Sequence, residues 1–185
     1  MKLFSKNVSR LLYELCEIIF ISIAVAALTY IFAGQFLEVS GDSMKPTLAD
    51  KEQILAEKLS IKYQGLKRGD IAIFYSPEQP DKLIVKRIVG LSGETIKISN
   101  GIVFINDNPI NEAYIDKSQV TLGKGSIVQD TNYVIPNDKY VVLGDNRQNS
   151  IDSRDWGMLE KNKILGKALL VYSPIKNFRF LFQSR

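Results

Sequence analysis

The stretch ETIKISNGIVFIN, residues 94–106, carries the clearest fold signal in the chain. Two runs rich in β-branched and aromatic residues flank the dipeptide Asn100-Gly101. A two-residue hairpin turn of type I′ requires positive φ angles at both of its residues, and Asn followed by Gly adopts them readily. The stretch therefore predicts a β-hairpin that reverses at Asn100-Gly101.

Short runs of similar composition occur on both sides of this hairpin. They are bounded by Gly, Pro, Asn and Asp, and no amphipathic helical pattern of useful length separates them, which is typical of a β-rich domain. Residues from about 106 to 137 are polar and irregular and indicate an elaborated loop or insertion. The sequence thus predicts one mostly β domain over residues 38–185. Its further strand candidates are QILAEKL (53–59), DIAIFYS (70–76), KLIVKRIVG (82–90), KYVVLG (139–144) and KALLVYS (167–173).

The N-terminal part of the chain has a different pattern. Its first ten residues carry three basic side chains and no acidic one, and residues 18–37 carry no charge. Twenty helical residues at about 1.5 Å each span about 30 Å, the thickness of the hydrocarbon core of a bilayer. We predict a transmembrane helix over residues 15–37, a short cytoplasmic N-terminus over residues 1–14 and an extracytoplasmic domain, because basic segments stay inside the cell.

Two other interpretations of this segment stay open. A basic leader, an apolar stretch and the small residues Ala24-Val25-Ala26 are typical of a cleavable secretion signal, although the apolar run continues past Ala26. The other interpretation is a helix buried in a protein core, although nothing interrupts its apolar circumference for about five turns.

The composition excludes several kinds of catalytic and metal site. The 185 residues include no histidine and one cysteine, Cys16. A Ser-His-Asp triad, a Cys-His pair, histidine-ligated metals, multi-cysteine zinc sites and an internal disulfide are therefore impossible. The net charge of +4 suits an anionic membrane surface or nucleic acid, but a basic solvated surface is the simpler interpretation.

The stretch GDSMKPTL, residues 41–48, has the character of a nucleophile loop around Ser43. A serine nucleophile needs a base, and without histidine the remaining chemically sensible base is lysine. With an ordinary pKa of about 10.4, roughly one lysine in 2500 is neutral at pH 7, whereas a pKa of about 8 raises this to about one in ten. Burial in apolar surroundings lowers the pKa of a lysine in this way.

Lys86 is the best candidate for such a base. In a strand, Ile84, Lys86 and Ile88 point to one face, so two branched aliphatic side chains flank the lysine on its own side, while Arg87 faces the other way. Lys97 lies in a strand with more polar neighbours. Lys45 is close to Ser43 in sequence but belongs to a polar loop. A lysine that extends from a strand to water remains an equally good interpretation of Lys86, as a simple turn does of Ser43.

A third motif, GDNRQNSIDSRDWG, covers residues 144–157. It follows the strand candidate KYVVL and is dense in groups that form hydrogen bonds. Its paired Asp and Arg residues, its amides and the chain's only tryptophan indicate a fixed polar network rather than a solvated loop.

Taken in order, four motifs and the N-terminal segment resemble the type I signal peptidases, the membrane-anchored Ser-Lys endopeptidases that remove signal peptides from exported proteins. The motifs are SGDSMKPTL (40–48), RGDIAIFYSP (68–77), VKRIVGLSGETI (85–96) and GDNRQNSIDSRDWG (144–157). The resemblance implies a compact, mainly antiparallel β fold, an acyl-enzyme mechanism without cofactor or metal, and a location in the cell membrane. It also implies that the partners are the lipid bilayer and preproteins emerging from the translocon, and not nucleic acid.

The same resemblance implies roles for individual residues. Ser43 corresponds to the nucleophile, Lys86 to the general base and Ser150 to a serine that orients the lysine amine. Where some members have a serine in the oxyanion hole this chain has Gly41, so the hole would use backbone N–H groups of Ser43 and of the Gly41 region. The supporting acidic and ion-pair positions are Asp145, Asp152 and Arg154, and the substrate-pocket positions are Val39, Met44, Leu48, Ile84 and Val85.

Three further alternatives and one hypothesis complete the expectations. A Ser-Lys peptidase with a narrow client, a non-catalytic pilus-assembly relative and a self-cleaving Ser-Lys repressor share parts of this pattern. The repressor would need a helical DNA-binding domain, where this chain offers a predicted membrane-spanning segment instead, and intact Ser43 and Lys86 argue against the non-catalytic relative. The tail KNFRFLFQSR, residues 176–185, suggests either a contact with the membrane interface or a last strand packed on the core.

Overall fold

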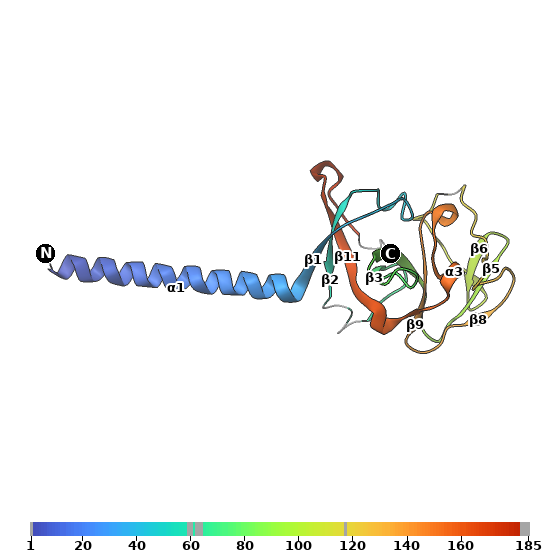
Figure 1. Ribbon diagram of the computed structural model, residues 1–185, viewed down its shortest axis with the longest axis horizontal. Helices are drawn as coiled ribbons and strands as arrows, with labels where there is room; N and C mark the ends of the chain where they lie inside the picture. Colours follow the sequence, from blue (N-terminus) through green and yellow to red (C-terminus); the bar gives the residue numbers. More distant parts are fainter. Residues whose placement is uncertain (1, 59–60, 62–64, 117, 182–185) are drawn as a thin grey trace. The chain divides into compact units, whose positions relative to one another are not determined.

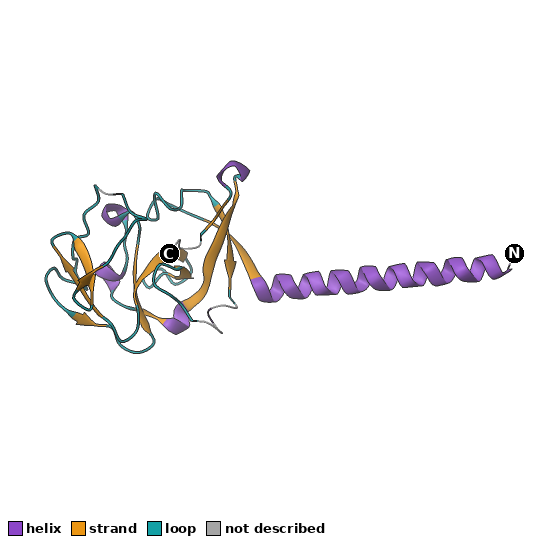
Figure 2. Ribbon diagram, turned by 180° about the vertical axis from the view of Figure 1, so that it is seen from behind, coloured by secondary structure: helices purple, strands orange, loops and turns teal. Residues whose placement is uncertain are grey.

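The computed structural model describes residues 2–58, 61, 65–116 and 118–181. The chain divides into two compact units, Met1–Gln35 and Phe36–Arg185. The first unit is helical, and the second consists mostly of strands and loops with short helical turns (Figure 2).

Helix α1 occupies Lys2–Ala33. The helix therefore includes residues 15–33 of the predicted span and begins earlier, whereas residues 34–37 are not helical. No Pro or Gly occurs between residues 2 and 33, so nothing delays the start of the helix, and Gly34 then favours its end. Residues Gly34–Glu38 form strand β1 instead. In the part of the chain that the structure describes, no helix combines the length and apolar character needed to cross a membrane, so the predicted transmembrane helix is not supported.

The larger sheet of the second unit has the strand order β1-β2-β11-β3-β4-β9-β10, and β12 pairs with β11 beside this path. The pairings that join β2, β3, β4, β9, β10, β11 and β12 are antiparallel, as predicted. The bounds are β2 Gln53–Glu57, β3 Ile71–Tyr75, β4 Leu83–Gly90, β9 Lys139–Leu143, β10 Leu159–Glu160, β11 Ile164–Ser173 and β12 Arg179–Phe180.

The smaller sheet has the order β7-β6-β5-β8 and is also antiparallel. Its strands are β5 (Thr95–Ser99), β6 (Ile102–Ile105), β7 (Asn108–Pro109) and β8 (Tyr133–Val134). Within the second unit, β5, β6 and β8 lie together at the end away from β2 and β11 (Figure 1). The segment 106–137 that was expected to be irregular thus has a two-residue strand near each end.

The hairpin at the centre of the smaller sheet forms as predicted. Ser99 pairs with Ile102, and the two turn residues Asn100 and Gly101 have φ angles of 49° and 79°. The other strand candidates also lie on strands, each within a few residues of the predicted bounds. Short helical turns complete the unit: η1 (Arg147–Asn149), α3 (Ser153–Trp156), η2 (Lys161–Lys163) and η3 (Ile175–Asn177).

The apolar core lies on both faces of strand β4. One cluster joins β2, β3 and β11 to Met44 and Leu48 of the nucleophile loop, and Leu83 and Val85 pack against it. A second cluster lies on the other face of β4 and includes Ile88. A third cluster packs β9 against the hairpin of the smaller sheet. Strand β4 is therefore held in the middle of the unit.

The C-terminal segment is tied to the core by a buried acid. Glu52, only 3% exposed, accepts hydrogen bonds from Arg179 and from the Asn177 side chain. Strand β12 pairs with β11, which agrees with the interpretation of the tail as a last strand. Phe178 and Phe180 are exposed and stack edge to face, whereas Phe182 lies outside the described residues.

Replacing Gly101 should destabilise the domain. In Gly101→Ala, the left-handed backbone conformation at residue 101 would cost about 1–2 kcal/mol, because the alanine Cβ comes too close to the backbone in that conformation. The new Cβ would also lie 2.5 Å from Cγ1 of Val120. We expect urea unfolding of Gly101→Ala to show this loss. The matched change Asn100→Gly should alter the free energy of unfolding by less than about 0.5 kcal/mol, and an equal loss in both variants would contradict the turn assignment.

Candidate active site

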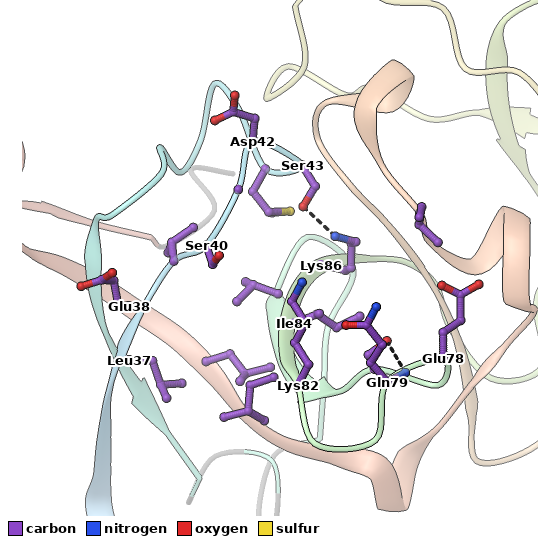
Figure 3. A pocket seen from close by; sticks show the side chains of 18 of the residues that line it. Leu37, Glu38, Ser40, Asp42, Ser43, Glu78, Gln79, Lys82, Ile84 and Lys86 are labelled. Carbon is purple, nitrogen blue, oxygen red and sulfur yellow. Dashed lines mark hydrogen bonds between the residues drawn. The ribbon is translucent and has the colours of Figure 1, made fainter.

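Ser43 and Lys86 meet at one end of a pocket of about 310 Å³. The Lys86 amine donates a hydrogen bond to Ser43 Oγ over 2.7 Å. The two side chains point toward each other from separate segments, the loop after β1 and strand β4 (Figure 3). The structure thus brings together the two residues that the sequence proposed as nucleophile and base.

The nucleophile loop is positioned by its apolar residues. Met44 and Leu48 are 1% and 0% exposed and belong to the core beside β2, β3 and β11. The N–H of Leu48 donates to the Met44 carbonyl, and the N–H of Lys45 donates to the Asp42 carbonyl, so the loop forms tight turns. Burial of Met44 directly after Ser43 leaves the serine at the pocket surface.

Lys86 is positioned by its strand. Strand β4 lies between β3 and β9, and Lys86 pairs with Ala72 across the sheet. The side chain is only 4% exposed. Burial, the main cause, lowers the pKa of Lys86 to about 8, although the carboxylates of Asp152 and Asp145 act against this shift. A base with this pKa is partly neutral near pH 7.

The two alternative lysines have other surroundings. Lys97 is on β5 in the smaller sheet, where its amine lies 3.6 Å from Asp107 and over the ring of Phe104. Lys45 forms a half-exposed ion pair with Asp42 at 3.0 Å. Neither contact directs the amine to Ser43, so the geometry favours Lys86.

Arg87, the neighbour of Lys86, is buried and ion-paired. It donates to both carboxylate oxygens of Asp145, at 2.8 and 2.6 Å, and also to the Gly69 carbonyl. Sequence analysis placed Asp145 in a supporting role but did not identify this partner. A buried arginine needs a partner acid, so an arginine inside the apolar run KLIVKRIVG was the available signal.

Asp152 and Arg154 form a second buried ion pair. Arg154 donates to both oxygens of Asp152 at 2.8 Å, and the carboxylate also accepts from the Gly144 N–H at 3.0 Å. Burial acts to raise the pKa of Asp152, but the bonds from Arg154 and Gly144 outweigh it and the pKa is lowered. Asp152 is also the N-cap of α3, so this pair fixes the end of the loop that carries Ser150.

Ser150 is buried near the Ser43 carbonyl but does not make the expected contact with Lys86. Its Oγ makes no hydrogen bond within the described part of the chain. Its carbonyl accepts from the Lys124 amine at 2.7 Å. A Cβ added at Gly144 would lie 2.2 Å from Ser150 Oγ and 2.6 Å from the Ser43 carbonyl oxygen, so glycine lets these segments approach closely.

The expected oxyanion donors differ in availability. The N–H of Gly41 donates to Oδ1 of Asp50 over 2.7 Å, so it is already engaged. The N–H of Ser43 donates to no acceptor among the residues the structure describes. Gly41 has a φ of 90°, which explains a glycine at this position. The backbone donor that remains for an oxyanion is therefore that of Ser43.

The pocket walls match most of the expected substrate positions. Val39, Met44, Ile84 and Val85 line the pocket. Leu48 does not, because it turns inward and is fully buried in the core. Further apolar lining residues that sequence analysis did not identify are Leu37, Ile73, Leu83, Ile151 and Trp156.

Part of the segment 106–137 also supports the site. Arg147, which follows the Asp145 loop, donates to both carboxylate oxygens of Glu112. The hydroxyl of Tyr114 donates to the same carboxylate over 2.5 Å, and the ring of Tyr114 lies 4.0 Å from the Arg87 guanidinium. Burial, followed by the neighbouring Glu112, raises the pKa of Tyr114. These long-range contacts have no local sequence signal.

The arrangement suits nucleophilic catalysis by serine with a lysine base. Among the described residues, no cluster of three or more His, Cys, Asp or Glu side chains could hold a metal ion. What the site supplies is a hydroxyl, an amine with a lowered pKa, a free backbone donor and a pocket with both apolar and polar lining residues.

Comparison with known proteins gives consistent matches. Residues 12–173 match the family model described as signal peptidase, peptidase S26. Signal peptidase I P of Bacillus subtilis subsp. natto is 38% identical, with 96% of both chains covered. Signal peptidase I U of Bacillus subtilis is 36% identical with 88% of both chains covered.

Two further matches come from other bacteria. Signal peptidase IB of Staphylococcus aureus is 32% identical over 91% of this chain and 95% of its own length. A solved signal peptidase I from Enterococcus faecalis is 29% identical and covers 55% of this chain and 95% of its own, with a TM-score of 0.46. The family model and the sequence relatives cover most of the chain, including both motifs that meet in the pocket, and the chain therefore belongs to the signal peptidase family, peptidase S26.

Proposed function

We propose that this protein is a membrane-anchored serine endopeptidase that removes signal peptides from exported preproteins with Ser43 and Lys86. The observation that carries the proposal is the 2.7 Å hydrogen bond between the Lys86 amine and Ser43 Oγ in a pocket lined by both apolar and polar residues. Membership of the signal peptidase family supports the choice of substrate. The alternative of a non-catalytic relative is disfavoured because both reacting groups are present and in contact.

The first half of the reaction forms an acyl-enzyme. Neutral Lys86 takes the hydroxyl proton of Ser43 as Oγ attacks the scissile carbonyl carbon. The Ser43 N–H stabilises the resulting oxyanion. The tetrahedral intermediate then collapses, the carbon–nitrogen bond breaks, and protonated Lys86 gives its proton to the leaving amine.

The second half restores the enzyme. Lys86, neutral again, takes a proton from a water molecule that attacks the ester carbonyl, and the lysine then returns this proton to Ser43 Oγ as the ester bond breaks. The released signal peptide carries the new carboxyl group. Ser150 acts as a positioning group in this scheme. Its buried Oγ lies next to Gly144 and close to the Ser43 carbonyl, and it would accept a hydrogen bond from the Lys86 amine after rotation of the lysine side chain.

The apolar part of the pocket lining determines which bonds are cut. Val39, Met44, Ile84 and Val85 leave room for small apolar side chains, which fits the Ala-x-Ala pattern of signal-peptide cleavage sites. Burial of these side chains by the substrate also excludes water from the region around Lys86. The preproteins would reach the site as they leave the translocon.

Variants of the proposed base should separate catalysis from binding. Lys86→Ala and Ser43→Ala should each reduce cleavage of a preprotein with an Ala-x-Ala site by at least about 10³-fold, because each removes one half of a unit that works together. Lys97→Ala is the matched control and should cleave normally. The measurement is the initial rate with detergent-solubilised full-length protein. Cleavage by Lys86→Ala at the control rate would place the base elsewhere.

The rate should also depend on pH in a defined direction. Only the neutral amine accepts the Ser43 proton, so kcat/KM should be low in acid and rise with pH through the lowered pKa of Lys86, about 8. A profile measured from pH 6 to 10 tests this. A rate that is still rising at pH 10 without reaching a plateau, as the ordinary lysine value of 10.5 would give, would contradict the proposed environment of Lys86.

Membrane attachment is the part of the proposal that rests on the N-terminal segment. Residues 18–37 carry no charge, and the side chains of Ile18, Ile19 and Phe20 on α1 are exposed apolar groups. The basic residues before them favour a cytoplasmic N-terminus and a domain outside the cytoplasm. In that arrangement the enzyme and a membrane-inserted signal peptide share one plane, which raises their effective concentration.

Charges placed in this segment should release the protein from membranes. Each aspartate near the middle of a membrane helix costs about 2.5–3.5 kcal/mol, so the double variant Ile23→Asp/Ala26→Asp should move to the soluble fraction after alkaline carbonate extraction. The matched variant Ile23→Leu/Ala26→Leu should stay in the pellet with the unchanged protein. Release of the unchanged protein would rule out anchoring by this segment, without affecting the peptidase prediction.

A further inference from the structure

We propose that Asn146 is a positioning residue that holds the backbone on both sides of Ser43 and thereby aims the Ser43 N–H at the developing oxyanion. This inference rests on the proposed peptidase function and assigns a role to a residue that does not touch the substrate. It follows from two hydrogen bonds that join the loop after β9 to the loop after β1.

Asn146 donates to two successive carbonyl groups of the nucleophile loop. Its backbone N–H donates to the Ser43 carbonyl oxygen over 3.0 Å, and its side-chain Nδ2 donates to the Asp42 carbonyl oxygen over 3.2 Å. The Asp42 carbonyl also accepts from the Lys45 N–H over 3.1 Å. One residue therefore contacts the peptide groups before and after the nucleophile.

Because the peptide group is planar, these contacts to carbonyl groups also fix the direction of the Ser43 N–H. A trans peptide is planar, and its C=O and N–H point in opposite directions. The Asp42 carbonyl shares a peptide plane with the Ser43 N–H, and the Ser43 carbonyl shares one with the Met44 N–H. Neither peptide is cis. When Asn146 holds both carbonyls, the two planes flanking the Ser43 Cα are fixed, and the Ser43 N–H points away from Asn146.

The direction of this N–H matters because the expected second donor is engaged. The Gly41 N–H donates to Asp50, whereas the Ser43 N–H has no acceptor within the described ranges. Stabilisation of an oxyanion by a fixed donor depends on where that donor points before the reaction begins. A loop free to rotate its peptide planes would lose this advantage.

Asn146 itself belongs to a segment that buried ion pairs hold in place. Its neighbours Asp145 and Arg147 are 0% and 1% exposed, and each forms a buried ion pair, with Arg87 and Glu112 respectively. The Asn146 carbonyl accepts from the Asn149 N–H over 3.1 Å at the start of η1. The two flanking ion pairs leave the Asn146 backbone little freedom, so its side chain reaches Asp42 from a fixed base.

Two substitutions test this role. Asn146→Ala removes the side-chain donor and keeps the backbone bond to Ser43. Asn146→Asp has the same shape but sets a carboxylate oxygen against the Asp42 carbonyl. Gln148→Ala is the matched control, because Gln148 is in the same loop, exposed and outside the pocket. Asn146 is itself partly exposed, so the variants should fold, and thermal unfolding of each purified full-length protein checks this.

The kinetic signature should be a loss in kcat with little change in KM. We expect kcat on an Ala-x-Ala preprotein to fall about 10- to 100-fold in Asn146→Ala, less than the roughly 10²- to 10³-fold cost of deleting an oxyanion donor. In Asn146→Asp, kcat should fall further. The midpoint of the pH profile should not move, because Lys86 is untouched. Unchanged kcat, or a shift of that midpoint, would overturn the inference.

A binding measurement keeps the inference separate from the peptidase proposal. When a peptide aldehyde ending in Ala-x-Ala binds, Ser43 Oγ bonds to its carbonyl carbon, the C=O π bond breaks and the hydroxyl proton passes to Lys86. The hemiacetal oxygen then occupies the oxyanion position, whereas the matching alcohol cannot react in this way. We expect Asn146→Ala to reduce the aldehyde-to-alcohol affinity ratio by the same factor as kcat. An unchanged ratio would overturn the role of Asn146. A wild-type protein that cleaves no preprotein but still prefers the aldehyde would count only against the proposed substrate.

Discussion

The amine of Lys86 lies 2.7 Å from Ser43 Oγ in surroundings that disfavour its charge, and much of the domain contributes to keeping it there. Strand β4 is paired on both sides, so the lysine cannot move toward water with its strand. The core beside β2, β3 and β11 anchors Met44 and Leu48, which brings the serine to the lysine from the other side. Without this double anchoring, the contact would open and the amine would regain its charge.

Two buried arginine–carboxylate pairs lie near this contact, and they affect the charge state of Lys86. Unpaired acids next to Lys86 would favour its charged form, and both Asp145 and Asp152 do act in that direction. Arg87 and Arg154 each form a buried ion pair with one of these acids, and Arg154 acts on the pKa of Lys86 in the opposite direction to them. Arg87 adds rigidity because it also binds the Gly69 carbonyl and packs against Tyr114. The loop can therefore be polar and well ordered beside a lysine that must lose its proton.

The sequence was sufficient for the parts of the structure that depend on local pattern. Runs of β-branched residues predicted the longer strands, and Asn100-Gly101 predicted the turn. The lack of histidine led from Ser43 to a lysine inside an apolar strand, and the structure brings these two side chains into contact.

Other features depend on contacts between distant segments and could not be predicted. Strands β7, β8, β10 and β12 have two residues each, which is too short for a recognisable period. The inward turn of Leu48 and the engaged N–H of Gly41 depend on how the nucleophile loop folds back on the core and on Asp50. The C-terminal end of α1 was placed too far along the chain because the apolar run continues into β1, and hydrophobicity alone does not distinguish a helix from a strand.

The buried lysine also affects how the stability of the fold varies with pH. Its pKa is about 8 in the folded state and 10.5 as the ordinary value, so between these limits the unfolded chain binds more protons than the folded one. The free energy of unfolding then increases as pH rises through this window and has its smaller value below pH 8. At neutral pH most Lys86 amines are charged, and the burial of this charge lowers the free energy of unfolding. The same property that makes Lys86 suitable as a base makes the domain less stable than one with an apolar residue in its place.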